Sequence, residues 1–369
     1  MHQKAPFFVL ISPLDWGLGH ATRCIPIIKE FIQQGAQVII ATSGSQKTLL
    51  KMEFPLLEYV EIPGYEISYK PGFLLKWALI FRIPDMLKQI KREHKWLEAF
   101  VKDRKIDLVI SDSRFGLYHK NLLCVFVTHQ LFIQSGLGLG RSAGRLIDKQ
   151  ILKWNNKFIS KFSSCWVPDL NGDISLAGTL SHPPVHPPFP VSYIGILSRF
   201  EPIEKMIVKN SLLILISGPE PERTRFENIL LGQLRNCKMH TILVRGLPGN
   251  ETPVPYIQEG IKIYNHLPAE QLNGIMNESE MIISRSGYST IMDLVKIKKN
   301  AILVPTPGQS EQEYLGKYLH NKKWMFCVQQ KKFNLNKVLT AFQNSEMNIP
   351  ESAALSLHNA VEEVLKKIS

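Results

Sequence analysis

The sequence predicts an α/β protein made of two Rossmann-like, doubly wound domains. Two observations predict this fold: short apolar runs alternate with helical segments, and the alternation restarts after a charged break at residues 198–210. A third is the length of 369 residues, which exceeds the usual size of a single core and favours two domains.

The first half opens with a strand, a loop and a helix. The apolar run 7–14 leads into the loop Asp-Trp-Gly-Leu-Gly-His, and residues 21–32 then carry apolar side chains at helical spacing. Gly35 suits the end of that helix, and a strand at 37–44 completes the unit. Further strands are predicted at 57–63, 106–113, 123–130, 164–170 and 191–197.

The second half repeats this alternation, and an amphipathic helix closes the chain. Its strands are predicted at 211–218, 240–246, 261–267, 281–287, 301–308 and 324–330. The proposed division is a first domain at 1–198, a second at 199–345, and a C-terminal helix at 346–369 that we expect to pack back on the first domain.

Composition excludes several classes of protein. The apolar content of 44% and charged content of 21% are those of a globular protein, and no window reaches the roughly 18 apolar residues of a spanning helix. The N-terminus resembles a first strand more than a signal peptide, and the five scattered cysteines indicate neither a disulfide framework nor a zinc site. We therefore expect a cytoplasmic protein. A net charge of +12 indicates an anionic partner, which charge alone does not identify as nucleotide, nucleic acid or lipid.

The loop after the first strand is the first candidate site. Gly17 and Gly19 allow a ligand close to the backbone, although a tight turn explains them equally well. His20 is expected at a helix N-terminus, where the dipole keeps the ring neutral and able to act as a general base toward an acceptor hydroxyl. The alternative is a capping or partly buried histidine.

Two polar clusters in the second half form another candidate site. Residues 284–287 end a strand, and Thr290 to Asp293 fit a capping box, so Asp293 either caps a helix or accepts hydrogen bonds from ribose hydroxyls. Gln309 and Gln312 follow the next strand, where their amides suit sugar hydroxyls or phosphate. Neighbouring strands of one sheet would bring the two clusters together.

A third Gly turn follows the strand 211–218. Ser217 and Gly218 end this strand near several arginines, which suits a diphosphate, although arginines on a solvated helix face are commoner. No loop matches the P-loop pattern of ATPases, and the loop after the first strand lacks the dinucleotide fingerprint. These absences disfavour both ATP hydrolysis and hydride transfer.

The motifs together resemble the inverting GT-B glycosyltransferases of family 28, which include the enzyme that adds N-acetylglucosamine to the lipid-linked peptidoglycan precursor. The resemblance covers the layout of essentially the whole chain and rests on four motifs. They are Gly17 to His20, Gly195 to Arg199, Ser284 to Asp293, and Glu311-Gln312 with Gln309 nearby. The last two motifs look closer still to a group of poorly assigned bacterial glycosyltransferases of this fold.

The resemblance implies two domains facing a central cleft, with the acceptor on the first and the nucleotide-sugar on the second. It implies that His20 is the catalytic base and that Arg199 lies near the donor diphosphate. The implied donor-binding residues are Gly17, Gly19, Arg199, Ser217, Gly218, Leu267, Arg285, Ser286, Gly287, Thr290, Asp293, Gln309 and Gln312. Two departures are a Ser217-Gly218-Pro219 turn in place of Gly-Gly-Ser, and His129-Gln130-Leu131 in place of Glu-Gln-Asn, which puts the peptidoglycan acceptor in question.

The expected reaction transfers a hexose or N-acetylhexosamine from a UDP-sugar, UDP-GlcNAc being favoured, to a lipid-linked or cell-envelope glycan. We expect no cofactor and no essential metal, because no Asp-x-Asp occurs and amides with arginine can stabilise the leaving group. We expect no nucleic acid partner. The alternatives are a UDP-sugar 2-epimerase of the same fold and a non-catalytic protein that binds anionic surfaces.

Residues 72–105 join basic and aromatic side chains in one stretch. This composition suits peripheral contact with an anionic bilayer at the inner face of the cytoplasmic membrane, and the same apolar residues equally suit packing on the sheet.

Overall fold

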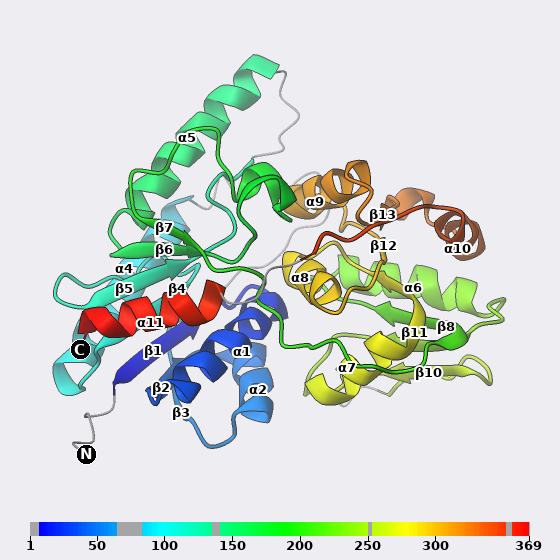
Figure 1. Cartoon of the computed structure of the whole chain (residues 1–369), viewed down its shortest axis with the longest axis horizontal. Helices are drawn as coiled ribbons and strands as arrows, with labels where there is room; N and C mark the ends of the chain where they lie inside the picture. The colour runs from blue at the N-terminus through cyan, green and yellow to red at the C-terminus, as the bar shows by residue number, and fades with distance from the viewer. Residues whose placement is uncertain (1–6, 65–82, 135–140, 250–252, 352–355, 369) are drawn as a thin grey trace. The chain divides into compact units, whose positions relative to one another are not determined.

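The computed structural model describes residues 7–64, 83–134, 141–249, 253–351 and 356–368. Two compact units divide the chain (Figure 1). The first contains the described residues up to Leu197 together with the C-terminal helix, and the second runs from Ser198 to Glu351.

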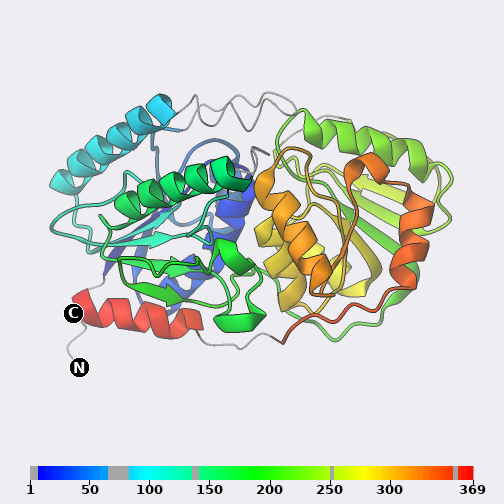
Figure 2. The same ribbon diagram turned by 90° about the horizontal axis from the view of Figure 1, so that it is seen from above.

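The first unit is a parallel sheet with helices on both faces. Within the described residues its strand order is β3-β2-β1-β4-β5-β6-β7. Figure 2 shows α4 and α5 on one side of this sheet and α11 on the other. The strands are β1 (Phe8–Pro13), β2 (Gln37–Ala41), β3 (Glu58–Val60), β4 (Leu108–Asp112), β5 (Leu123–Val127), β6 (Ser164–Val167) and β7 (Val191–Tyr193). The helices are α1 (Leu18–Gln33), α2 (Gly44–Glu53), α4 (Ile83–Asp103), α5 (Arg141–Ile159), α11 (Ser356–Ile368) and the short η1 (Gly172–Ile174) and η2 (Gly178–Leu180).

The core of the first unit forms because the central strands are apolar on both faces. Val9, Leu10 and Ile11 of β1 are fully buried, as parallel strands covered by helices require. The C-terminal helix α11 contacts α1, where His358 Nδ1 lies 2.8 Å from Glu30 Oε1.

The second unit repeats this plan with a smaller sheet. Its strand order in the described part of the chain is β10-β9-β8-β11-β12-β13, and each neighbouring pair is parallel. Helices α6 and α10 share one hydrophobic core with the sheet. The strands are β8 (Val208–Leu215), β9 (His240–Val244), β10 (Ile261–Tyr264), β11 (Ser279–Ser284), β12 (Ile302–Leu303) and β13 (Phe326–Cys327). The helices are α6 (Glu222–Leu234), α7 (Ala269–Glu278), α8 (Tyr288–Lys296), α9 (Ser310–Asn321), α10 (Leu335–Gln343) and the short η3 (Gln330–Lys332).

The α/β fold with two Rossmann-like units is confirmed, and a strand lies within or across each run that the sequence analysis assigned to one. Two strands of the second unit begin earlier than predicted. Strand β11 begins at Ser279, before the predicted run 281–287. Strand β8 begins at Val208, inside the segment 198–210 that we interpreted as a break. Residues 208–210 are exposed and include Lys209 and Asn210, so the apolar pattern that marks a buried strand is missing there.

Two glycines in helices of the second unit offer a matched test of this packing. A Cβ on Gly316 of α9 would lie 2.7 Å from Cys327 Sγ and 2.8 Å from Pro305 Cγ, whereas a Cβ on Gly232 of α6 would meet no atom within 4 Å. We expect Gly316→Ala to lower the free energy of unfolding by about 1–3 kcal/mol through overpacking. Gly232→Ala should raise it by about 0.5–1 kcal/mol, because alanine restricts the unfolded chain. Urea unfolding of both variants measures this, and equal tolerance of the two would contradict the close approach of α9 to β13.

Candidate active site

The first sheet reverses its strand order between the neighbouring strands β1 and β4. The chain runs from β1 to β2 on one side, whereas β4 is followed by β5 on the other. Parallel α/β sheets bind ligands beyond the carboxyl ends of the strands at such a switch point. The loop after β1 leads to His20 and the loop after β4 begins with Ser113, so both bring polar groups to this position.

Helix α1 begins directly after Gly17. This residue has a φ of 69°, a left-handed conformation that glycine adopts with little cost. Gly19 and His20 follow as the second and third residues of the helix. The predicted turn and the predicted position of His20 at the helix start are therefore confirmed, whereas the roles of the three residues stay predictions.

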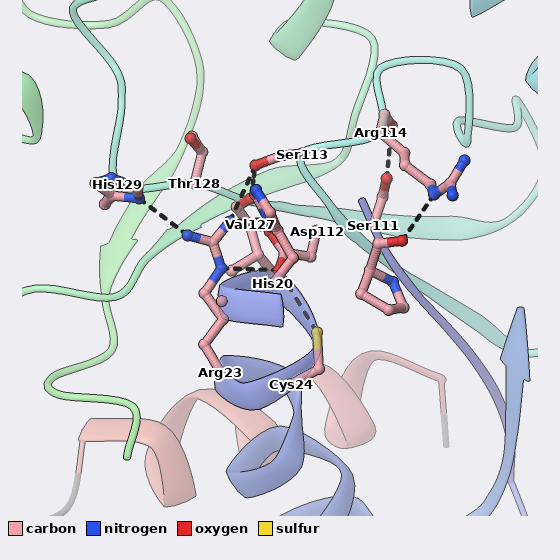
Figure 3. A network of polar contacts seen from close by, with 12 residues as sticks. His20, Arg23, Cys24, Ser111, Asp112, Ser113, Arg114, Val127, Thr128 and His129 are labelled. Carbon is pink, nitrogen blue, oxygen red and sulfur yellow. Dashed lines mark hydrogen bonds and ion pairs between the residues drawn. The ribbon is translucent and has the colours of Figure 1, made fainter. Parts of the chain in front are cut away.

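His20 belongs to a hydrogen-bond network around the buried carboxylate of Asp112 (Figure 3). Arg23, one helical turn further on, binds this carboxylate through both of its oxygens: Nε donates to Oδ2 at 2.7 Å and Nη2 donates to Oδ1. His20 Nδ1 lies 3.2 Å from Asp112 Oδ1 and 2.9 Å from Arg23 Nη2. On its other side, Arg23 Nη1 lies 2.9 Å from Nδ1 of His129, which follows β5. The network thus joins α1, β4 and the end of β5.

Burial and the neighbouring charges together hold Asp112 ionised and His20 neutral. Burial by itself would raise the pKa of Asp112, but the Arg23 guanidinium and the hydrogen bonds from His20 and Arg23 outweigh burial and hold that pKa well below its usual range. The pKa of His20 is lowered, first by burial and then by the positive charge of Arg23. A neutral ring was predicted, but the prediction attributed it to the helix dipole alone.

Neither Arg23 nor Asp112 was predicted as a site residue from the sequence. Asp112 is the second-last residue of the predicted run 106–113, and an acid at the carboxyl end of a buried strand is a usable signal. Arg23 carries no comparable signal, because a single arginine in an amphipathic helix usually faces solvent. His129 was noted only as a departure from the family motif, whereas the structure places it against Arg23.

The second sheet has its own switch point, between β8 and β11. Ser217 and Gly218 follow β8 and are exposed, as a ligand-binding turn requires. Gly218 has a φ of 110°, and a Cβ there would lie 3.5 Å from the hydroxyl of Thr306, which follows β12. Residues after β8 and β12 therefore meet at one edge of the sheet.

The two predicted polar clusters of the second half lie together, as expected for neighbouring strands. Ser286 follows β11 and Gln312 lies in α9. The Ser286 hydroxyl donates to the backbone carbonyl of Gln312 at 2.8 Å. The Gln312 side chain accepts from the Thr306 amide at 2.9 Å and donates to the side chain of Gln309. Gly287 precedes α8, and Thr290 lies half-buried in its first turn.

Asp293 lies in the second turn of α8, so the capping-box interpretation was wrong. The helix begins at Tyr288, which puts Thr290 and Asp293 inside it, and Gly287 occupies the N-cap. Asp293 Oδ1 instead accepts from the hydroxyl of Ser198 at 2.6 Å. Burial raises the pKa of Asp293 to about 6, although the positive charge of Arg199 and the bond from Ser198 act in the opposite direction. Burial lowers the pKa of His266, and the positive charge of Arg199 lowers it further. Arg199, Asp293 and the unpredicted His266 are therefore neighbours.

Two predicted donor-binding side chains are part of the core instead. Arg285 is 1% exposed, and it donates to Gln330 Oε1 at 2.7 Å and to the Glu222 carbonyl at 2.9 Å while lying 4.2 Å above the Phe226 ring. The Arg285 guanidinium donates to acceptors inside the unit and is buried. A phosphate of the nucleotide-sugar therefore has no exposed surface of Arg285 to contact. Leu267 is 3% exposed, which leaves its side chain equally unavailable.

Three observations concern metals and membranes. In the described residues, no three His, Cys, Asp or Glu side chains are grouped as a metal site would require. None of the described helices is long and apolar enough to span a bilayer. Of the stretch 72–105, residues 72–82 lie outside the described residues, and α4 contains most of the remainder. Trp96 and Phe100 of α4 pack on the core of the first unit.

Comparisons with known proteins point to one class of enzyme. Residues 247–368 match the family model described as the glycosyltransferase family 28 C-terminal domain. A protein of Methanosarcina acetivorans is 25% identical over 337 residues, covering 83% of this chain and 81% of that protein. One from Methanosarcina mazei is 22% identical over 322 residues, with the same two coverages. Both are described as uncharacterized glycosyltransferases.

Solved structures share the fold over nearly the whole chain. A UDP-glucosyltransferase of Polygonum tinctorium has a TM-score of 0.63 at 14% identity and covers 99% of both chains. The spinosyn forosaminyltransferase SpnP has a TM-score of 0.60 at 12% identity, covering 99% of this chain and 95% of its own. MurG of Acinetobacter baumannii has a TM-score of 0.52 at 14% identity, with coverages of 98% and 94%. Together with the sequence matches, these show a glycosyltransferase of the GT-B fold, whereas the donor and acceptor stay predictions.

The buried ion pair of the first unit gives a testable dependence of stability on pH. Asp112→Asn leaves the Arg23 guanidinium buried without its counter-charge, so we expect the free energy of unfolding to fall by about 3–5 kcal/mol at neutral pH. Because the native pKa of Asp112 is lowered, its ionised form stabilises the native state above about pH 4, and this stabilisation is lost as the pH falls further. The deficit of the variant should therefore shrink between about pH 5 and about pH 2 in urea unfolding.

The exposed Asp173 offers the matched control, since Asp173→Asn removes the same charge from the surface of the same unit. It should change stability little at any pH. A deficit of Asp112→Asn that is equal at both ends of the pH range would show that the carboxylate charge is not what stabilises the site.

Proposed function

We propose that this glycosyltransferase moves a hexose or an N-acetylhexosamine from a UDP-sugar to a hydroxyl of a lipid-linked or cell-envelope glycan, with inversion at the anomeric carbon. The observation that carries the proposal is the His20 and Asp112 pair at the switch point of the first sheet. A neutral imidazole whose Nδ1 is held by a carboxylate presents Nε2 as a base, the arrangement by which hydrolases activate a hydroxyl.

The proposed step begins with Nε2 of His20 taking the proton of the acceptor hydroxyl. The acceptor oxygen then forms a bond to the anomeric carbon on the face opposite UDP, and the bond from that carbon to the diphosphate oxygen breaks with its electrons leaving on UDP. Asp112 stabilises the imidazolium that forms, because its carboxylate is already ionised. Arg199 and exposed amides such as those at Ser217 and Gly218 are the groups proposed to stabilise UDP.

The second unit supports a nucleotide-sugar as the donor. Asp293 has a pKa of about 6, so it is mainly ionised at neutral pH and can accept hydrogen bonds from ribose hydroxyls. Gln309 and Gln312 add amide groups at the next strand end, where the resemblance to family 28 places sugar recognition. Uridine is the base favoured by that resemblance, and one structural relative is a UDP-glucosyltransferase by name. UDP-GlcNAc is the donor to test first.

The proposed acceptor and membrane contact rest on surface charge. Helix α4 exposes Lys88, Lys91, Arg92 and Lys95, and a run of exposed cations attracts the anionic surface or diphosphate of a lipid-linked acceptor. The reaction is proposed to need no metal, because arginine and backbone amides supply the positive potential.

A single substitution tests the role of His20. We expect His20→Ala to reduce transfer by at least about 100-fold, because a positioned general base contributes about 10²–10⁴ to the rate. Binding of UDP-GlcNAc, measured by calorimetry, should change little, because His20 is not among the proposed donor-binding residues and most of those lie in the second unit. The transfer assay follows the glycosylated acceptor by mass spectrometry, with and without EDTA, and EDTA should leave the rate unchanged.

Two controls make this assay decisive. His186→Ala removes an exposed histidine of the same unit and should leave transfer intact. Donor incubated without acceptor should stay unchanged, because conversion to an epimer in that control would indicate a UDP-sugar 2-epimerase. Full activity of His20→Ala would remove His20 from the mechanism.

A further inference from the structure

The Nη2 nitrogen of Arg23 has more hydrogen-bond acceptors around it than it has N–H groups to donate. It carries two N–H groups, since a guanidinium has donors only. At least three atoms lie within reach: Asp112 Oδ1, Ser113 Oγ at 3.0 Å and His20 Nδ1 at 2.9 Å (Figure 3). One of the two N–H groups donates to the Asp112 carboxylate, because a charge-assisted hydrogen bond is the strongest of the three. Ser113 and His20 therefore compete for the other.

The outcome of this competition decides which nitrogen of His20 carries the proton. If Nδ1 accepts from Arg23, the single proton of the neutral ring sits on Nε2, which then cannot accept another. If Nδ1 donates to Asp112 Oδ1 instead, Nε2 has a free electron pair. Only the second tautomer is a base toward an acceptor hydroxyl.

Ser113 is placed to accept a hydrogen bond from Arg23. It is the first residue after β4 and has a φ of 59°, a left-handed conformation that is uncommon for residues other than glycine. Its amide donates to the Val127 carbonyl at 3.1 Å, and its hydroxyl donates to the same carbonyl at 3.4 Å. With its own proton directed at β5, the hydroxyl oxygen presents lone pairs to Arg23. A constrained backbone thus holds an acceptor at this position.

We propose that Ser113 is a positioning residue that sets the tautomer of His20. The Ser113 hydroxyl accepts a hydrogen bond from the second N–H of Arg23 Nη2. His20 Nδ1 is then left to donate to Asp112, and Nε2 can serve as the base. The consequence for turnover rests on the proposed function, whereas the tautomer is a property of the protein without any substrate.

Ser113→Gly tests this inference, because glycine adopts the left-handed conformation freely and the change removes the hydroxymethyl side chain with its acceptor oxygen. The protein is labelled with ¹⁵N-histidine, and the His20 signals are assigned by their loss in His20→Gln. At about pH 8, where the lowered pKa of His20 keeps the ring neutral, the wild type should be protonated at Nδ1. Ser113→Gly should shift the proton to Nε2 and reduce kcat/KM roughly tenfold, the effect of one hydrogen bond.

Two further variants separate the tautomer from backbone effects. Ser113→Asn tolerates a positive φ and keeps an acceptor oxygen, so it should retain the wild-type tautomer. Lys298→Gly makes the same kind of change at an exposed residue with a φ of 55° in the second unit, and should alter neither the tautomer nor turnover.

The tautomer decides between the outcomes. If His20 stays protonated at Nδ1 in Ser113→Gly, or is protonated at Nε2 already in the wild type, the inference is overturned whatever the turnover. If the proton shifts to Nε2 only in Ser113→Gly, the inference holds, even where no variant and no wild-type protein transfers sugar. That last case would contradict the proposed function alone.

Discussion

The bidentate ion pair between Arg23 and Asp112 is the interaction on which the candidate site of the first unit depends. Both groups are almost fully buried, and removing two charges from water costs more than their attraction returns unless their remaining donors and acceptors are also satisfied. Here the satisfying partners come from three segments: His20 one turn earlier in α1, Ser113 directly after β4, and His129 after β5. The ion pair therefore holds three chain segments around the imidazole of His20.

The two units treat their buried acids in opposite ways. Asp112 is paired with a guanidinium that holds its pKa far below the usual range, so it stays ionised and orients a neighbouring ring. Asp293 receives a hydrogen bond from Ser198 and is near Arg199, but burial dominates and raises its pKa to about 6. The ionised form of such a buried carboxyl group is stabilised by additional hydrogen-bond donors, and the hydroxyls of a ligand can supply them.

The sequence predicted the architecture because buried parallel strands are short apolar runs, and it predicted His20 because a Gly turn before a helix is a local pattern. It failed where the deciding contact is distant. Arg285 matches a family motif, yet contacts with Glu222 and Gln330 occupy it in the core. Arg23 resembled a solvated helix residue, because its partner Asp112 is 89 residues away in the chain. Burial and long-range pairing decide these roles, and neither is encoded in spacing.

We propose that this glycosyltransferase uses a UDP-sugar, so its selectivity among nucleotides is the property to measure. Thermal unfolding would be followed with UDP, UDP-GlcNAc, UDP-glucose, UDP-galactose, GDP-mannose and a CMP-sugar, because a ligand that binds only the native state raises its stability. A higher unfolding midpoint is expected with UDP and with one UDP-sugar only, and a smaller rise in Asp293→Ala. No response to any nucleotide, or equal responses to the UDP, GDP and CMP compounds, would rule out a UDP-sugar as the donor.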